Sequence, residues 1–70
     1  MPLSFAPTER AVRVVKILAD EKTKKHLESL GITVNSQINI IMQSSGSIIC
    51  QIKDGRLALD KNIASKILVA

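Results

Sequence analysis

The second half of the chain alternates apolar and polar residues in short runs that are separated by turn signals. The first of these runs is Gln37–Met42. Ile38, Ile40 and Met42 lie two residues apart within it and are expected on one face, because successive side chains of a strand point to opposite sides. The pattern therefore predicts strands rather than long helices here, and it restricts the fold to a small sheet.

Two further runs extend this pattern into a meander. Ser44–Gly46 forms a turn signal that leads into a third strand over Ser47–Lys53. Asp54-Gly55 predicts a tight hairpin because both residues tolerate a positive φ, and Arg56–Leu59 returns as a short fourth strand. Inward-facing positions are expected at Ile48, Cys50 and Ile52 in the third strand and at Leu57 and Leu59 in the fourth.

The two ends of the chain complete the predicted sheet. Arg10–Leu18 is rich in β-branched residues and is interrupted by cations, which favours a strand with one side or end in water. Asn62–Val69 contains a helical turn and a final short strand that can pair with the first. Two prolines in Met1–Pro7 withhold backbone donors and predict a lead-in arm. We expect five short strands in a strongly bent sheet that closes into a barrel and so removes exposed strand edges.

One helix is predicted between the first and second strands, over Asp20–Leu30. Its first residues are acidic, which suits a helix N-terminus, and Gly31 can adopt the left-handed conformation that ends a helix. Thr23, Leu27 and Leu30 are spaced to share one face, which predicts that this face packs on the sheet.

The core must be aliphatic. Of 70 residues, 46% are hydrophobic but only 1% are aromatic, so Ile, Leu, Val and Ala are expected to pack around the single Phe5. The near absence of aromatic rings also weakens the case for nucleic-acid binding, because single-stranded bases usually stack on such rings.

Charge and cysteine content indicate the kind of partner and the cellular compartment of the protein. Ten basic and six acidic residues give a formal net charge of +4, which favours acidic partners. The single Cys50 cannot form an internal disulfide, and the start of the chain lacks the pattern of a secretory leader. No apolar run approaches the roughly 20 residues that a membrane-spanning helix needs. We therefore expect a cytoplasmic protein.

Two segments resemble the FeoA family of small SH3-like barrels, which are associated with bacterial ferrous iron uptake. Leu27–Ile32 is similar to the family's helix end, and Gly55–Leu59, followed by Ala64 and Ile67–Val69, is similar to its C-terminal pattern. The resemblance covers nearly the whole chain. It implies a single FeoA-like domain over residues 1–70, mainly β, in the form of an SH3-like barrel of about five strands with one inserted helix.

Some positions depart from the family pattern. Val34-Asn35 stands where Pro-Gly is usual, and Asn35 is expected to take the left-handed position that glycine would occupy. Thr23 replaces an apolar residue, and Asp60 stands where a cation is frequent. These departures affect contacts with partners more than they affect the fold.

The resemblance implies a role without catalysis. Free-standing members of the family resemble accessory proteins of the ferrous iron transporter, which is a membrane protein with a GTPase domain. Other copies of the domain form the terminal domains of metal-dependent repressors. This chain carries no helix-turn-helix pattern, so the transporter setting fits better. The partner is then the cytosolic part of the transporter. The alternative is a small basic barrel that binds nucleic acid.

The sequence contains few residues that could act in catalysis or bind a metal. His26 and Cys50 are the only histidine and cysteine, and nothing in the sequence indicates that they form a catalytic pair, so we expect no enzyme activity. Cys50 is best explained as a small core residue and His26 as an exposed helix residue. No closed metal site is predicted. A weak contact with Fe(II), made by carboxylates or His26 from several subunits of a homo-oligomer, stays open.

The densest charge lies in the predicted helix, at Lys22, Lys24, Lys25 and His26. One interpretation is a solvated helix face, which is common for lysines. The other is a docking surface for an acidic patch on a partner. Lys22, Lys25 and His26 share one side of a helix, while Lys24 lies further round.

Overall fold

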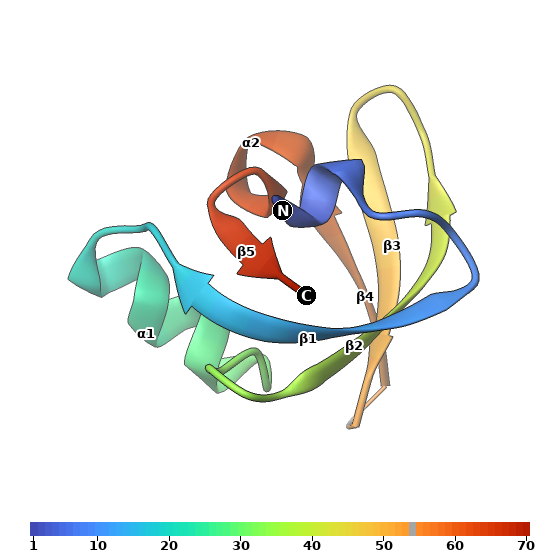
Figure 1. Cartoon of the computed structure of the whole chain (residues 1–70). Coiled ribbons are helices and arrows are strands. Elements are labelled where there is room, and N and C mark those ends of the chain that lie inside the picture. Colours follow the sequence, from blue (N-terminus) through green and yellow to red (C-terminus); the bar gives the residue numbers. More distant parts are fainter. Residues whose placement is uncertain (54) are drawn as a thin grey trace.

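The computed structural model describes residues 1–53 and 55–70. These residues form five short strands and three short helices, and Figure 1 shows how they follow one another. In chain order they are the 3-10 helix η1 (Leu3–Phe5), β1 (Arg10–Ile17), α1 (Glu21–Ser29), β2 (Gln37–Gln43), β3 (Ser47–Ile52), β4 (Gly55–Asp60), α2 (Lys61–Ala64) and β5 (Ile67–Val69). The four strands that were predicted with bounds are confirmed to within one residue at either end, and β5 is the final short strand predicted within Asn62–Val69.

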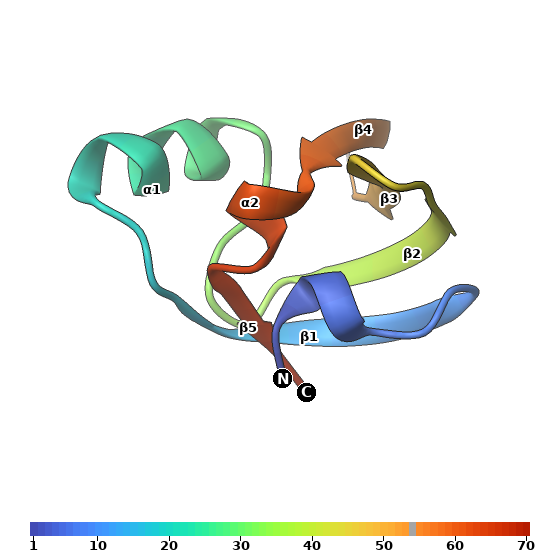
Figure 2. The same ribbon diagram turned by 90° about the horizontal axis from the view of Figure 1, so that it is seen from above.

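The strands form a single antiparallel sheet in the order β4-β3-β2-β1-β5. β5 pairs with β1, as expected from the sequence, although a register shift falls between Val14 and Lys16. The strands bend around an interior that lies between β2 and β3 on one side and β5 on the other, which Figures 1 and 2 show from two directions. The prediction of a mainly β, SH3-like fold of five strands is confirmed.

The strands β4 and β5 end the strand order, and the free side of β5 is covered by the first residues of the chain. Val69 donates its N–H to the carbonyl of Met1 at 2.7 Å and accepts a bond from the N-terminal amine, while Pro2 bridges to Leu68. The predicted lead-in arm is therefore an integral part of the fold.

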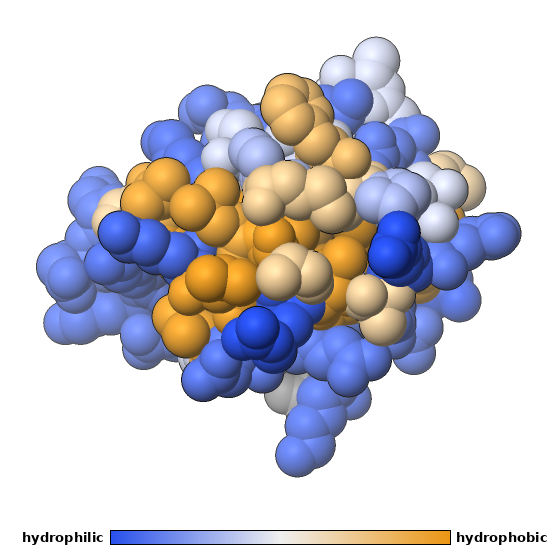
Figure 3. All heavy atoms as spheres, in the orientation of Figure 1, coloured by the Kyte–Doolittle hydropathy of each residue, from blue (hydrophilic) through white to orange (hydrophobic). Residues whose placement is uncertain are grey.

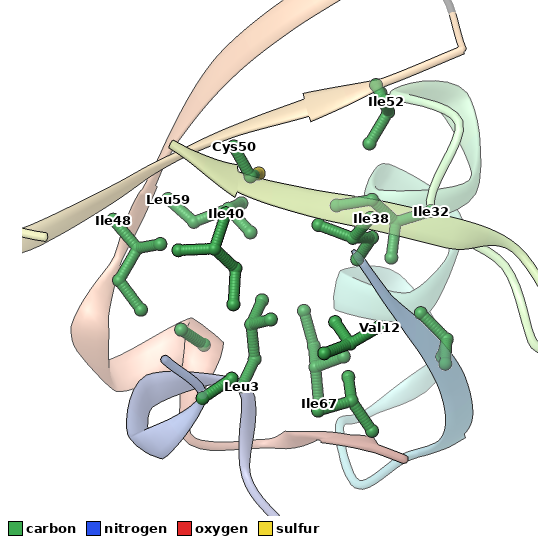
Figure 4. Packing of buried hydrophobic residues seen from close by; sticks show 14 of the residues in the cluster. Leu3, Val12, Ile32, Ile38, Ile40, Ile48, Cys50, Ile52, Leu59 and Ile67 are labelled. Atoms are coloured by element: carbon green, nitrogen blue, oxygen red, sulfur yellow. The ribbon is translucent and has the colours of Figure 1, made fainter. Parts of the chain in front are cut away.

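The interior is aliphatic, but Phe5 does not belong to it. Leu3 and Ala6 are buried, whereas 78% of the surface of Phe5 is exposed. A 3-10 helix has three residues per turn, so Leu3 and Ala6 lie on the same side of η1 and Phe5 points elsewhere. In Figure 4, Leu3 and Ile67 face Ile40 and Ile48 across the core. The other buried residues are Val12, Val14, Ile17, Leu27, Ile32, Ile38, Cys50, Ile52, Leu59, Ala64 and Val69.

The second strand departs from its predicted alternation. Ile38 and Ile40 are buried as expected, but Met42 is 54% exposed. The register of β2 on β3 shifts between Ile40 and Met42, and an extra residue at such a bulge turns the following side chains to the other face. Of the inward positions expected in β4, Leu59 is buried and Leu57 is half-buried.

The turn predictions at Gly31 and Asn35 are confirmed. Gly31 has φ of 95° at the end of α1, and Asn35 has φ of 74°. The hairpin that joins β3 to β4 is also present, but Gly55, with φ of 136°, pairs with Ile52 as the first residue of β4 and does not lie at the centre of the turn as predicted. The other predicted hairpin residue, Asp54, lies outside the described residues.

Candidate docking surface

The helix α1 positions all four residues of the predicted basic cluster. Asp20 caps its N-terminus, and the carboxylate accepts a bond from the backbone N–H of Thr23 at 2.8 Å. The hydrogen bonds from Thr23 lower the pKa of Asp20 below its usual 3.8, with a smaller contribution from the charge of Lys66. Leu27 is the buried residue of the helix, while Thr23 and Leu30 are half-buried. This packing fixes which residues of α1 point away from the sheet.

The structure separates the basic cluster into two parts. Lys22, Lys25 and His26 are exposed, in agreement with their predicted common side, and we call these three residues the α1 basic surface. Lys24 is half-buried and lies on a different side. It lines a hollow of about 550 Å³ between α1 and β1, together with Lys16, Ile17, Glu21, Glu28, Thr33 and Val34.

The electrostatic character of these two parts differs. The hollow brings two carboxylates, from Glu21 and Glu28, together with the ammonium groups of Lys16 and Lys24. Such a mixture of signs gives little attraction for a single anionic group. The three members of the α1 basic surface are exposed, and the carboxylates of Glu21 and Glu28, one helical turn from Lys25, are exposed as well. The α1 basic surface is therefore the part of the cluster that an acidic partner can reach from solvent.

Cys50 and His26 do not come together. Cys50 is buried in β3, where its Sγ donates to the carbonyl of Leu57 at 3.6 Å, and His26 is exposed on α1. Burial raises the pKa of the Cys50 thiol above its usual 9.0, which favours the protonated form. A protonated, enclosed thiol is a poor nucleophile and a poor metal ligand.

Within residues 1–53 and 55–70, no three His, Cys, Asp or Glu side chains gather in a way that could hold a metal ion.

In the same part of the chain, no helix is long and apolar enough to cross a membrane.

A polar groove is a feature that the sequence analysis did not identify. Its volume is about 640 Å³, and it is lined by Gly31, Thr33, Ser36, Gln37, Asn39, Gln51, Ile52 and Lys53. Asn39 lies opposite Gln51 in the pairing of β2 with β3. The alternation in the sequence marks both residues as outward-facing, but it does not reveal that the loop after α1 forms a second wall.

Comparison with known proteins identifies the family of this chain. The model of the FeoA domain matches residues 1–70. A relative from Methanocaldococcus jannaschii, named as Fe(2+) transport protein A, is 34% identical over 68 residues, which are 97% of this chain and 83% of the relative.

Solved structures show the same fold. The crystal structure of an iron uptake regulatory protein, FeoA, superposes with a TM-score of 0.91 at 27% identity and covers 99% of this chain and 93% of that one. The FeoA-like protein from Clostridium acetobutylicum gives a TM-score of 0.87 at 24% identity, over 100% of this chain and 84% of that one.

The fold also occurs as part of larger proteins. A manganese-dependent transcriptional repressor matches 96% of this chain with a TM-score of 0.86 at 21% identity, although the match covers only 39% of the repressor. At this identity the likeness concerns the fold alone. The match of the FeoA model along the entire chain and the iron-transport relative agree with each other, and the chain belongs to the FeoA domain family.

Proposed function

We propose that this protein is a cytoplasmic accessory module of ferrous iron transport that acts by binding, without catalysis, to the cytosolic part of the GTPase-bearing membrane transporter. The observation that carries the proposal is the family match over residues 1–70, together with the relative named for Fe(2+) transport. The buried, protonated Cys50 and the distant His26 are consistent with a binding role, because neither side chain is placed for nucleophilic catalysis.

The docking contact is assigned to the α1 basic surface. Lys22, Lys25 and His26 project from a helix that buries only Leu27, so an acidic partner can approach them without disturbing the core. Complementary charge mainly speeds the encounter of two proteins and is screened by salt. The surface has no aromatic anchor, and we therefore expect modest affinity.

Charge reversal on α1 tests this assignment. Lys25→Glu should slow association with the isolated cytosolic GTPase domain about 3- to 10-fold at low salt and less at high salt. Lys24→Glu makes the same change at the neighbouring residue but on the side that faces the hollow, so its effect should be smaller. Arg56→Glu, on the exposed part of β4, controls for net charge.

The outcomes of this experiment separate the alternatives. If Lys25→Glu leaves the association kinetics unchanged at low salt, the basic cluster is a solvated helix face and not a docking surface. Failure of the wild-type protein to bind the GTPase domain, combined with salt-dependent binding of oligonucleotides, would favour the nucleic-acid alternative.

The proposal includes no tightly held metal. Any contact with Fe(II) is expected to be weak, because the buried thiol of Cys50 and the exposed His26 lie in different parts of the fold. Titration calorimetry with Fe(II) under reducing conditions should show weak binding at most. A stoichiometric metal that survives chelation would contradict this expectation.

A further inference from the structure

A second surface of the protein is apolar, and α1 has no part in it. It is formed by the outer side of β1 and β5 and by the segment around η1. Figure 3 shows apolar side chains gathered in the middle of this side of the molecule, with hydrophilic side chains around them. We call it the β1–β5 face. Its apolar members are Met1 (53% exposed), Phe5 (78%), Val15 (45%), Leu18 (51%) and the half-buried Leu68.

The strand register brings the apolar members and cations together. Ile67 and Val69 are buried, so Leu68 between them points outward. Leu68 lies opposite Lys16 on one side and bridges to Pro2 on the other. Leu18 donates its N–H to the carbonyl of Lys66, which places the backbone of that exposed lysine next to it.

The charge around the β1–β5 face is mainly positive. Arg13 pairs through its backbone with Ala70, next to the final buried residue of β5, and its exposed side chain donates a hydrogen bond from Nη1 to Asn35 Oδ1 at 3.0 Å. Lys16 and Lys66 are also exposed. The carboxylate of Asp20 interacts electrostatically with Lys66, but its hydrogen bond is accepted from the backbone N–H of Thr23 at the N-terminus of α1. Three exposed cations thus lie on β1 and on the residue before β5, next to the apolar residues in the strand register.

The shape of this face favours a broad partner over an inserted side chain. Its apolar members line neither the hollow beside α1 nor the polar groove on β2 and β3. They project from the outside of the sheet and from η1. Projecting apolar groups among lysines and arginines are complementary to a lipid surface, where acyl chains accept the apolar groups and anionic headgroups attract the cations.

We propose that the β1–β5 face binds reversibly to an anionic lipid bilayer surface. Phe5 and Leu18 would enter the boundary between headgroups and acyl chains, while Arg13, Lys16 and Lys66 contact lipid phosphates. This inference goes beyond the proposed docking to a transporter and uses different residues, so vesicles without protein are sufficient to test it.

The first measurement compares two vesicle compositions. The full chain should float with vesicles made of equal parts of phosphatidylcholine and phosphatidylglycerol at low salt, and it should bind less as salt is raised. Vesicles of phosphatidylcholine alone should retain much less protein, because each cation near an anionic surface contributes about a fivefold gain in binding.

Matched variants then separate this face from the net charge of the protein. Lys16→Glu should lower vesicle binding about 10- to 25-fold, because it removes one favourable charge and adds an unfavourable one. Lys25→Glu makes the same change on α1 and should lower binding by a smaller factor. Leu18→Ser should reduce binding about tenfold, while Met42→Ser, at a similarly exposed position on β2, should leave it nearly unchanged.

Several results would overturn the proposal. One is a wild-type protein that does not bind the anionic vesicles. Another is equal loss from Lys16→Glu and Lys25→Glu, or from Leu18→Ser and Met42→Ser, because binding would then not be localised on this face. A third is sedimentation that shows a dimer which Leu18→Ser dissociates, since the face would then be covered by a second copy of the chain. Circular dichroism of each variant establishes that it is folded.

Discussion

Residues 1–7 and α1 are similar in length but attach to the sheet in opposite ways. The N-terminal segment has little regular structure, yet it buries Leu3 and Ala6 and forms backbone bonds with β5. The helix is the longest in the chain, yet it buries only Leu27. Regular local structure is therefore a poor measure of integration into the fold. The weakly attached helix leaves most of its surface free for a partner.

The largest expected effect on stability comes from removing the buried leucine of each region. The comparison tests whether the N-terminal segment and α1 contribute equally to the free energy of unfolding. Leu3→Ala and Leu27→Ala should each lower the free energy of unfolding by about 2–5 kcal/mol, because both side chains are fully buried. Urea unfolding provides the measurement. A loss below about 0.5 kcal/mol for Leu3→Ala would mean that the N-terminal segment is an arm after all.

A smaller effect is expected at the end of α1. Gly31 has φ of 95°, a conformation that strains any residue with a Cβ atom. Gly31→Ala should lower the free energy of unfolding by about 1 kcal/mol. Gly46→Ala, where an added Cβ would meet no atom within 4 Å, serves as the control in the same urea titration. Equal losses for the two variants would contradict the role assigned to the helix end.

The cap of α1 gives a pH-dependent prediction. The pKa of Asp20 is lowered in the folded protein, so its carboxylate stabilises the fold above about pH 3.8, and this contribution is lost as the pH falls through the lower folded value. Asp20→Ala should therefore lower the melting temperature near neutral pH and have less effect in acid. Asp20→Asn, which keeps a capping oxygen but does not titrate, should lose less at neutral pH. A penalty for Asp20→Ala that is the same at every pH would contradict the assigned pKa shift.

The smallest effect is expected at the aromatic ring of the N-terminal segment. Phe5→Ser should change the free energy of unfolding by less than about 0.5 kcal/mol, because the side chain is 78% exposed. The comparison with Leu3→Ala, two residues away, would show which side of η1 belongs to the core. A loss for Phe5→Ser as large as that for Leu3→Ala would reverse this assignment.

Several local features could be predicted because adjacent residues decide them. The strands follow from short-range alternation, and the positive φ of Gly31 and Asn35 follows from residue type. The burial of Cys50 follows from its place between Ile48 and Ile52. The common side of Lys22, Lys25 and His26 follows from helix geometry alone.

Other features depended on contacts between distant segments. The exposure of Met42 results from a bulge in the pairing of β2 with β3, and a bulge has no clear signal in this sequence. The half-buried position of Lys24 results from the approach of α1 to β1. The polar groove likewise needs a loop and two strands, so the alternation of Asn39 and Gln51 could not reveal it.

The sequence by itself determined the order of the five strands, the place of α1 and the end of that helix at Gly31, because periodicity and turn residues act over a few neighbouring positions. The family followed from the resemblance of two motifs. Only the tertiary structure decided which apolar residues are buried, and the N-terminus shows why. Both Leu3 and Phe5 are hydrophobic enough for a core. The interior beside β5 accepts the side of η1 that carries Leu3 and Ala6, so Phe5 is left on the surface.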